Sequence, residues 1–197
     1  MNNDASSVLW RRLLYMLTPQ LDLYENIGAI CQGKRVLEIG FGTGIGVLQY
    51  ANQAEYIDAV EIDEAAVEFA RKVFPLRNVR WLHDDFIDSS HNFKGYDLVV
   101  MIEVLEHVAN FDKAMAQIGR ALASGGRALL TVPNSLRYRR RREALNVREW
   151  TPKEFVDALS IIFPKVWLLD STLTPWLTED ALEHRETPII AGVARGR

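Results

Sequence analysis

The sequence contains little cysteine, little net charge and no long apolar run. Cys31 is the only cysteine among 197 residues, which excludes an internal disulfide and is typical of a reducing compartment. Arg11 and Arg12 interrupt the apolar residues near the N-terminus, so this segment does not resemble an export signal. No stretch approaches the roughly 20 apolar residues of a membrane-spanning helix. We therefore expect a cytoplasmic protein with no membrane partner.

The small net charge also limits the function classes. A formal net charge of −3 argues against a protein that coats nucleic acid by overall electrostatic attraction, although it leaves a local basic patch open. The apolar content of 48% and the charged content of 25% are ordinary for a globular protein. A chain of this length is long enough to bury one full hydrophobic core, so we predict a single domain over residues 1–197. Nothing in the sequence indicates an oligomeric state.

Short apolar runs alternate with helical segments along most of the chain. The runs are apolar throughout rather than at every second residue, as in strands that are covered on both faces. This alternation predicts an α/β fold with a doubly wound (Rossmann-like), mostly parallel sheet and helices on both faces. The seven expected strands are residues 36–39, 56–61, 79–82, 96–102, 127–132, 165–169 and 189–194. The expected helices include 47–54, 64–74, 111–122 and one that follows a capping box at 151–154.

Two helices are expected before the first strand. Apolar residues at helical spacing run from Val8 to Ile30, and Thr18-Pro19 divides them, because the residue before a proline avoids the helical conformation. Gly33 ends this section. We interpret residues 1–31 as an N-terminal helical cover that packs on one edge of the sheet.

Glycine occupies every second position after the first expected strand. The stretch Val36–Gly46 reads VLEIGFGTGIG, so a buried strand leads into a loop whose backbone can approach a ligand closely. The dinucleotide fingerprint G-x-G-x-x-G is absent, because its third glycine would fall at Ile45 or at Val47. By itself the loop is equally compatible with a glycine-rich turn that binds nothing.

Acidic residues stand in or after three of the expected strands, near the ends where open parallel sheets bind ligands. Glu38, inside the first strand, would be costly to bury without a cation, and a ligand ammonium group would relieve that cost. Glu61 can accept hydrogen bonds from both hydroxyls of a ribose. Asp85 can accept from the exocyclic amine of adenine while Phe86 packs on the ring, although Phe86 also suits the core. This acidic set favours a cationic cofactor over a dinucleotide.

Taken together, these motifs resemble class I S-adenosylmethionine-dependent methyltransferases. The resemblance implies an enzyme whose cofactor is S-adenosylmethionine, with a seven-stranded sheet whose last strand is antiparallel. One departure is Asp84, where related sequences often have glycine. The segments that occur in the order and spacing of the family are 36–46, 59–63, 84–86, 96–108 and 122–134.

The resemblance also implies which residues bind the cofactor. Glu61 is expected to bind the ribose, and Asp85 and Phe86 are expected to bind the adenine. The glycines of the loop are expected to line the methionine part. The complete expected cofactor site consists of Glu38, Gly40, Gly42, Gly44, Glu61, Ile62, Asp85, Phe86, Ile102 and Glu103.

A candidate base follows the fourth expected strand. In a helical turn, Glu103, Glu106 and His107 would share one face. Histidine is the side chain whose ordinary pKa lies nearest to neutral pH, so a histidine at this position is suited to take a proton from an acceptor hydroxyl or amine. We predict His107 as the catalytic residue, and the alternative is that it packs or caps locally.

The same three side chains also suit Mg²⁺ or Mn²⁺. Their Glu-x-x-Glu-His pattern resembles that of ubiquinone-pathway O-methyltransferases and that of metal-dependent RNA 2′-O-methyltransferases. Asn146 stands where the RNA enzymes have a further histidine. We therefore predict that the site holds no metal.

Arginines crowd the region that follows the fifth strand. Residues 137–148 contain six arginines and one acid, within a segment, 134–150, that borders the acceptor pocket in this fold. The functional interpretation is an anionic acceptor, such as a carboxylate, a phosphate or a nucleic-acid end. A solvated arginine loop is the alternative.

The predicted function is methyl transfer from S-adenosylmethionine to an oxygen of a small-molecule acceptor, with an anionic acceptor as one option. An RNA 2′-O-methyltransferase is the second hypothesis, favoured by the arginines and disfavoured by the overall acidity and by Asn146. A non-catalytic subunit that binds S-adenosylmethionine is the third. The sequence does not identify the acceptor.

Overall fold

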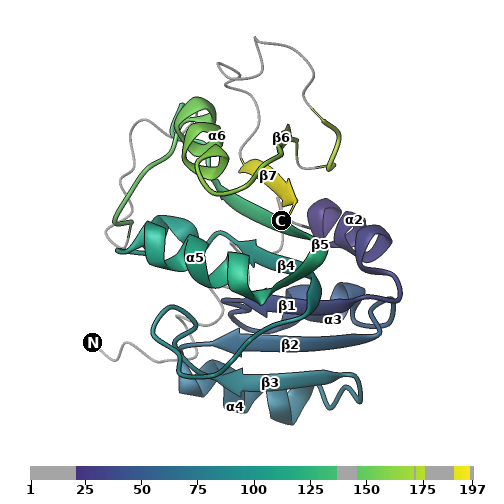
Figure 1. The fold of residues 1–197 in the computed structure, drawn as a ribbon. Helices are drawn as coiled ribbons and strands as arrows, with labels where there is room; N and C mark the ends of the chain where they lie inside the picture. Colours follow the sequence, from purple (N-terminus) through teal and green to yellow (C-terminus); the bar gives the residue numbers. More distant parts are fainter. Residues whose placement is uncertain (1–20, 137–145, 171, 176–188, 196–197) are drawn as a thin grey trace, which may run out of the picture.

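A computed structural model describes residues 21–136, 146–170, 172–175 and 189–195 (Figure 1). All seven strands that the sequence predicts are present, and the second of the two expected N-terminal helices is α2, whereas the first lies outside the described residues. The elements are α2 (Leu21–Cys31), β1 (Arg35–Ile39), α3 (Ile45–Tyr50), β2 (Tyr56–Glu61), α4 (Glu64–Val73), β3 (Val79–His83), β4 (Tyr96–Ile102), the 3-10 helix η1 (Leu105–His107), α5 (Phe111–Ala121), β5 (Leu122–Pro133), α6 (Pro152–Ser160), β6 (Val166–Leu169) and β7 (Ile189–Arg195).

The strands form one sheet in the order β3-β2-β1-β4-β5-β7-β6. Strands β1 to β5 pair in parallel with one another, and β7 pairs antiparallel with both β5 and β6. These pairings confirm the doubly wound, mostly parallel sheet and its antiparallel last strand. The order reverses between β1 and β4, which lie side by side at the centre. Doubly wound sheets bind ligands at such a reversal, outside the carboxyl ends of the strands.

Helices cover both faces of the sheet, because successive side chains of each strand point to opposite faces. In β1, Val36 belongs to the apolar layer that contains α2, α3 and α4, whereas Leu37 belongs to the layer that contains α5 and α6. Figure 1 shows α5 and α6 on one side of the sheet and α3 and α4 on the other. None of the helices within the described ranges is long and apolar enough to cross a membrane. A cytoplasmic location stays a prediction.

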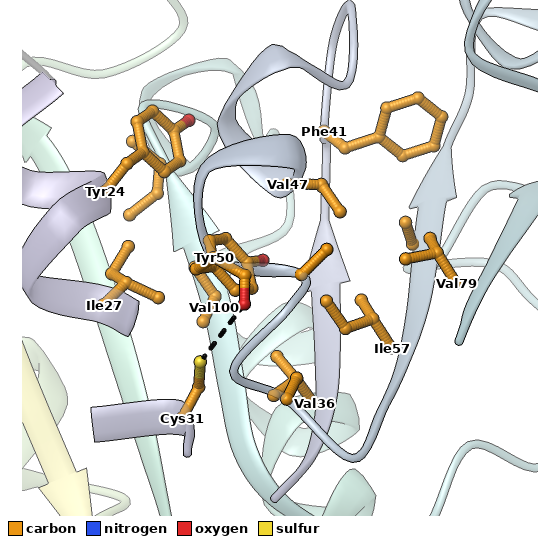
Figure 2. Packing of buried hydrophobic residues seen from close by; sticks show 14 of the residues in the cluster. Tyr24, Ile27, Cys31, Val36, Phe41, Val47, Tyr50, Ile57, Val79 and Val100 are labelled. Carbon is orange, nitrogen blue, oxygen red and sulfur yellow. Dashed lines mark hydrogen bonds between the residues drawn. The ribbon is translucent and has the colours of Figure 1, made fainter. Parts of the chain in front are cut away.

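Helix α2 packs on a face of the sheet, so the predicted position at an edge is wrong. Its buried residues Ile27 and Cys31 lie in one cluster with α3 and with Val36 and Val100 of the two central strands (Figure 2). The Cys31 thiol donates a hydrogen bond to the carbonyl oxygen of Tyr50 at 3.8 Å. The edge prediction failed because helical spacing identifies the apolar stripe of a helix but not the surface that receives it.

Two predicted elements also differ from the structure by more than one residue at an end. Helix α3 begins at Ile45 and ends at Tyr50, whereas the sequence predicts 47–54. Strand β5 already begins at Leu122, which pairs with Tyr96, whereas the sequence predicts a start at residue 127. The register of β5 on β4 shifts between Tyr96 and Leu98. This irregularity separates the first residues of β5 from its apolar run. Neither difference moves the carboxyl ends of the strands.

A buried carboxylate links three strands on the side of the sheet covered by α5. Asp58 of β2 accepts hydrogen bonds from Arg80 Nε and Nη2 of β3, at 2.6 and 3.0 Å. It also accepts from the hydroxyls of Tyr96 in β4, at 2.6 Å, and of Tyr56, at 3.1 Å. These donors offset the cost of burying the charge. Asp58 therefore connects β2, β3 and β4 independently of the residues expected at the ligand site.

We expect the substitution Asp58→Ala to lower the free energy of unfolding by about 3 kcal/mol, because it leaves the buried Tyr96 hydroxyl without its acceptor and removes the partner of Arg80. Urea unfolding measures this change. The matched control is Tyr56→Phe, which removes one partly buried hydroxyl and leaves Asp58 three donors, so its cost should stay below about 1 kcal/mol. Equal costs for the two variants would contradict this account.

Candidate functional site

The glycine loop after β1 has a backbone conformation that side chains rarely adopt. Gly40, Gly42 and Gly44 have positive φ angles of 74°, 57° and 82°. At Gly40 a Cβ atom would also lie 2.4 Å from Cγ2 of Val104, in the segment that follows β4. Glycine at this position therefore allows the end of β1 to lie directly against the end of β4. The loop is thus placed at the reversal of strand order.

The Glu61 carboxylate connects the ends of β1 and β2. Its Oε2 accepts a hydrogen bond from the Gly42 amide at 2.8 Å, and its Oε1 accepts from the amides of Ile62 and Asp63 at 2.8 and 3.2 Å. The side chain of Ile62 is 64% exposed beside it. A carboxylate has about four lone-pair positions, so Glu61 retains capacity for a ribose hydroxyl.

The segment after β3 contains the residues expected at the adenine. The Oδ1 atom of Asp85 accepts from the amides of Ile87 and Asp88 at 3.0 and 3.3 Å, so Oδ2 is the oxygen available to a ligand. The ring of Phe86 is 3% exposed and its centre lies 5.6 Å from that of Phe93. Phe86 therefore completes the core, and its contact with adenine stays a prediction.

Asp84, which departs from the glycine of related sequences, orders the same segment. Its Oδ2 accepts a hydrogen bond from Ser89 Oγ at 2.5 Å and lies 2.5 Å from Nδ1 of His91. A glycine could make neither contact. The departure therefore has a local structural role.

Glu38 is a buried carboxylate at the centre of this arrangement. It lies in β1 between Ala59 of β2 and Val100 of β4, and its side chain is 1% exposed. Among the described residues, none forms a hydrogen bond with its Oε2. Because burial disfavours the charged form, it raises the pKa of Glu38 from 4.5 to about 8. Burial therefore favours the protonated form of this carboxyl group beside the glycine loop at neutral pH.

A second carboxylate and a phenol lie near Glu38. Glu103 has a φ angle of 54°, and Thr131 of β5 holds it there: the Glu103 amide donates to Thr131 Oγ1, which donates to Glu103 Oε1, both at 3.0 Å. Burial raises the pKa of Tyr24 well above its ordinary value, and the charges of Glu38 and Glu103 raise it further. These three side chains therefore share one acidic environment.

His107 lies in η1, so the predicted helical face shared with Glu103 and Glu106 does not form. Glu103 precedes η1 in a left-handed conformation, Glu106 is buried, and the His107 side chain is 41% exposed. His107 Nε2 lies 3.8 Å from Glu106 Oε1. The Glu106 carbonyl accepts from the amides of Val147 and Arg148, at 2.8 and 3.1 Å. The expectation failed because Glu103 leaves the helical conformation before the turn begins.

In the ranges that the structure describes, no three histidine, cysteine, aspartate or glutamate side chains come together as metal ligands. That the site holds no metal stays a prediction.

Five of the six arginines of the predicted arginine-rich segment lie outside the described residues. The sixth, Arg148, stacks on Trp150 with its guanidinium carbon 3.6 Å from the ring centre, and Trp150 is buried.

Three residues of the site escape prediction from the sequence. Thr131, which holds Glu103, is detectable only as a lone hydroxyl in the apolar run of β5. No pattern in the sequence indicates that Val104 lies against Gly40. Tyr24 belongs to the apolar stripe of α2, and the stripe does not reveal which helix residue reaches the loop.

Comparison with known proteins identifies relatives of this chain. The family described as "Methyltransferase domain" matches residues 11–184. An uncharacterised methyltransferase of Mycobacterium tuberculosis is 30% identical over 106 residues, which make up 54% of this chain and 52% of that protein. A ubiquinone biosynthesis O-methyltransferase of Rickettsia akari is 24% identical over 158 residues, which make up 77% of this chain and 59% of that protein.

A solved structure extends the comparison over nearly the whole chain. The TehB-like SAM-dependent methyltransferase of Corynebacterium glutamicum matches with a TM-score of 0.70 and 20% identity, covering 98% of this chain and 96% of that one. This likeness confirms the Rossmann-like fold. The chain spans about half the length of the curated relatives it matches, from 52% to 59% for the two named above.

The raised pKa of Glu38 predicts that stability falls as the pH rises. From the unfolded pKa near 4.5 to the folded value of about 8, the unfolded chain has lost a proton that the folded chain retains. Stability from this group is therefore complete below pH 4.5 and decreases by about 1.4 kcal/mol per pH unit up to about pH 8.

Urea unfolding between about pH 6 and about pH 9 measures this slope. The variant Glu38→Gln has no proton to release, so its stability relative to the native chain should increase with pH and level off above about pH 8. A difference that stays constant over this range would show that Glu38 is already ionised in the free protein.

Proposed function

The chain belongs to the S-adenosylmethionine-dependent methyltransferase family, and on that premise we propose that it transfers a methyl group to an oxygen atom of a small-molecule acceptor. The observation that carries this proposal is an accessible imidazole, that of His107, which follows β4 at the reversal of strand order. An acceptor hydroxyl keeps its proton until transfer, so its methylation benefits from a base at this place.

The residues at the strand ends fit S-adenosylmethionine. A buried carboxyl group without a hydrogen-bond partner at Oε2, that of Glu38, suits an ammonium group, which would favour its ionised form. Glu61 would bind a ribose hydroxyl, and Asp85 would accept from the adenine amine through Oδ2. Gly40 and Gly42 adopt positive φ angles that other residues rarely adopt, so the loop can follow this path.

When bound, the cofactor supplies a methyl group that is already activated by its sulfonium. The protein then has two tasks, to hold the acceptor oxygen in line with that methyl group and to accept the proton that the oxygen loses. We assign the second task to Nε2 of His107. The Glu106 carboxyl group lies 3.8 Å from this atom.

Oxygen as the acceptor atom is supported by one relative. The Rickettsia akari protein is named a ubiquinone biosynthesis O-methyltransferase, and it aligns with 77% of this chain. We propose the same acceptor atom here, not the same substrate. A cytoplasmic location and the absence of a metal belong to the same proposal.

We expect His107→Ala to lower kcat by about a hundredfold, since a positioned base contributes on this order, while the Kd for S-adenosylmethionine stays unchanged. Transfer of radiolabelled methyl groups measures kcat, and titration calorimetry measures Kd. The matched control is His91→Gln, which alters an exposed histidine after β3 that contacts Asp84. An unchanged kcat in His107→Ala would show that His107 is not the base.

Incubating the protein with labelled cofactor and fractionated extract tests the acceptor class. We expect label in a small-molecule fraction, in a form stable to mild base as a methyl ether is. Label in RNA would favour a 2′-O-methyltransferase, and binding of the cofactor without transfer to any fraction would favour a non-catalytic subunit. A chelator should leave activity intact, so loss of activity that Mg²⁺ or Mn²⁺ restores would contradict the absence of a metal.

A further inference from the structure

We propose that Tyr24 of α2 binds the cofactor directly, by donating its hydroxyl to the carboxylate of the methionine part of S-adenosylmethionine. Tyr24 would have this role only in a protein that binds the cofactor as proposed above. The N-terminal helix would then form one wall of the binding site as well as covering the sheet.

The first observation is the close approach of Tyr24 to the glycine loop. A Cβ atom built on Gly46, at the second residue of α3, would lie 2.3 Å from Cζ and 2.6 Å from the hydroxyl oxygen of Tyr24. The tip of the tyrosine therefore occupies the position of a side chain at residue 46. Figure 2 shows Tyr24 projecting from α2 toward α3, on the same side of the sheet as Val47. Glycine at residue 46 keeps this position open for the phenol.

The second observation is that Tyr24 is only 5% exposed although it ends in a hydroxyl group. A phenol in such a place ordinarily finds a partner for its O–H group, and a group of a bound ligand can be that partner. The nearby ionisable groups are Glu38 and Glu103, whose charges raise the pKa of Tyr24. The phenol therefore stays protonated and remains a donor over the whole working pH range.

The third observation is the charge of the site. The methionine part of the cofactor carries an ammonium and a carboxylate. The ammonium suits Glu38 and Glu103, but the adjacent carboxylate is repelled by both and needs a donor that is not itself acidic. Tyr24 supplies an uncharged donor within the electrostatic reach of the two glutamates. Tyr24 can therefore bind the carboxylate of the methionine part, which the two glutamates repel.

Tyr24→Phe tests this role, because it retains the packing ring and removes only the hydroxyl. S-adenosylmethionine should bind about tenfold more weakly, as expected for the loss of one hydrogen bond to a charged group. Decarboxylated S-adenosylmethionine, which lacks the carboxylate, should bind Tyr24→Phe and the native chain equally. Titration calorimetry with both ligands measures these Kd values without any acceptor.

The matched control is Tyr50→Phe. Tyr50 lies in the same cluster, is fully buried, and has a hydroxyl without a hydrogen-bond partner among the described residues, but it stands at the far end of α3 (Figure 2). We expect no change in affinity for either ligand. Equal weakening of both ligands by Tyr24→Phe, with a lowered melting temperature, would assign Tyr24 a structural role and overturn the proposal. Unchanged affinity for S-adenosylmethionine would overturn it too, whereas a native chain that does not bind this ligand would overturn the proposed function itself.

Discussion

The site depends on a carboxyl group that the sheet buries without a cation. Glu38 lies in β1 between β2 and β4, and its side chain is 1% exposed. In a place of this kind a carboxyl group is neutral until a positive charge arrives, because the protein interior stabilises an isolated charge poorly. The ammonium of a bound ligand would replace the proton. On the proposed binding mode, binding and ionisation would be one event at this position.

The rest of the site is already held in place before any ligand arrives. Three backbone amides hold the Glu61 carboxylate, and Thr131 holds Glu103 through both its amide and its side chain. Ordered groups of this kind lose little conformational freedom when a ligand binds. Asp58 connects the strands through a separate set of donors. The residues that connect these strands and the residues proposed to contact the ligand are therefore different, although they belong to the same strands.

Most strands of the sheet could be predicted from the sequence, because an apolar run marks a strand that is covered on both faces. The run 96–102, for example, is β4 with the same bounds. Glu38 was visible for the same reason, as a charge within such a run. The link between Glu103 and Thr131 was not, because it depends on the register of β4 on β5, which no local pattern encodes. The position of Tyr24 could not be predicted either, because the spacing of apolar residues along a helix does not show which surface the helix packs against.

The pairing of Val36 with Leu98 has a consequence for how the protein folds. The glycine loop looks like a local motif, yet β1 acquires its central neighbour only after β2, α4 and β3 have been added to the chain. Non-local pairing of this kind forms late, since the loop between the strands must close first. During synthesis, Glu38 would stay in water with an ordinary carboxylate charge until β4 emerges. The ability to capture the cofactor would then appear at one late step, together with the completed centre of the sheet.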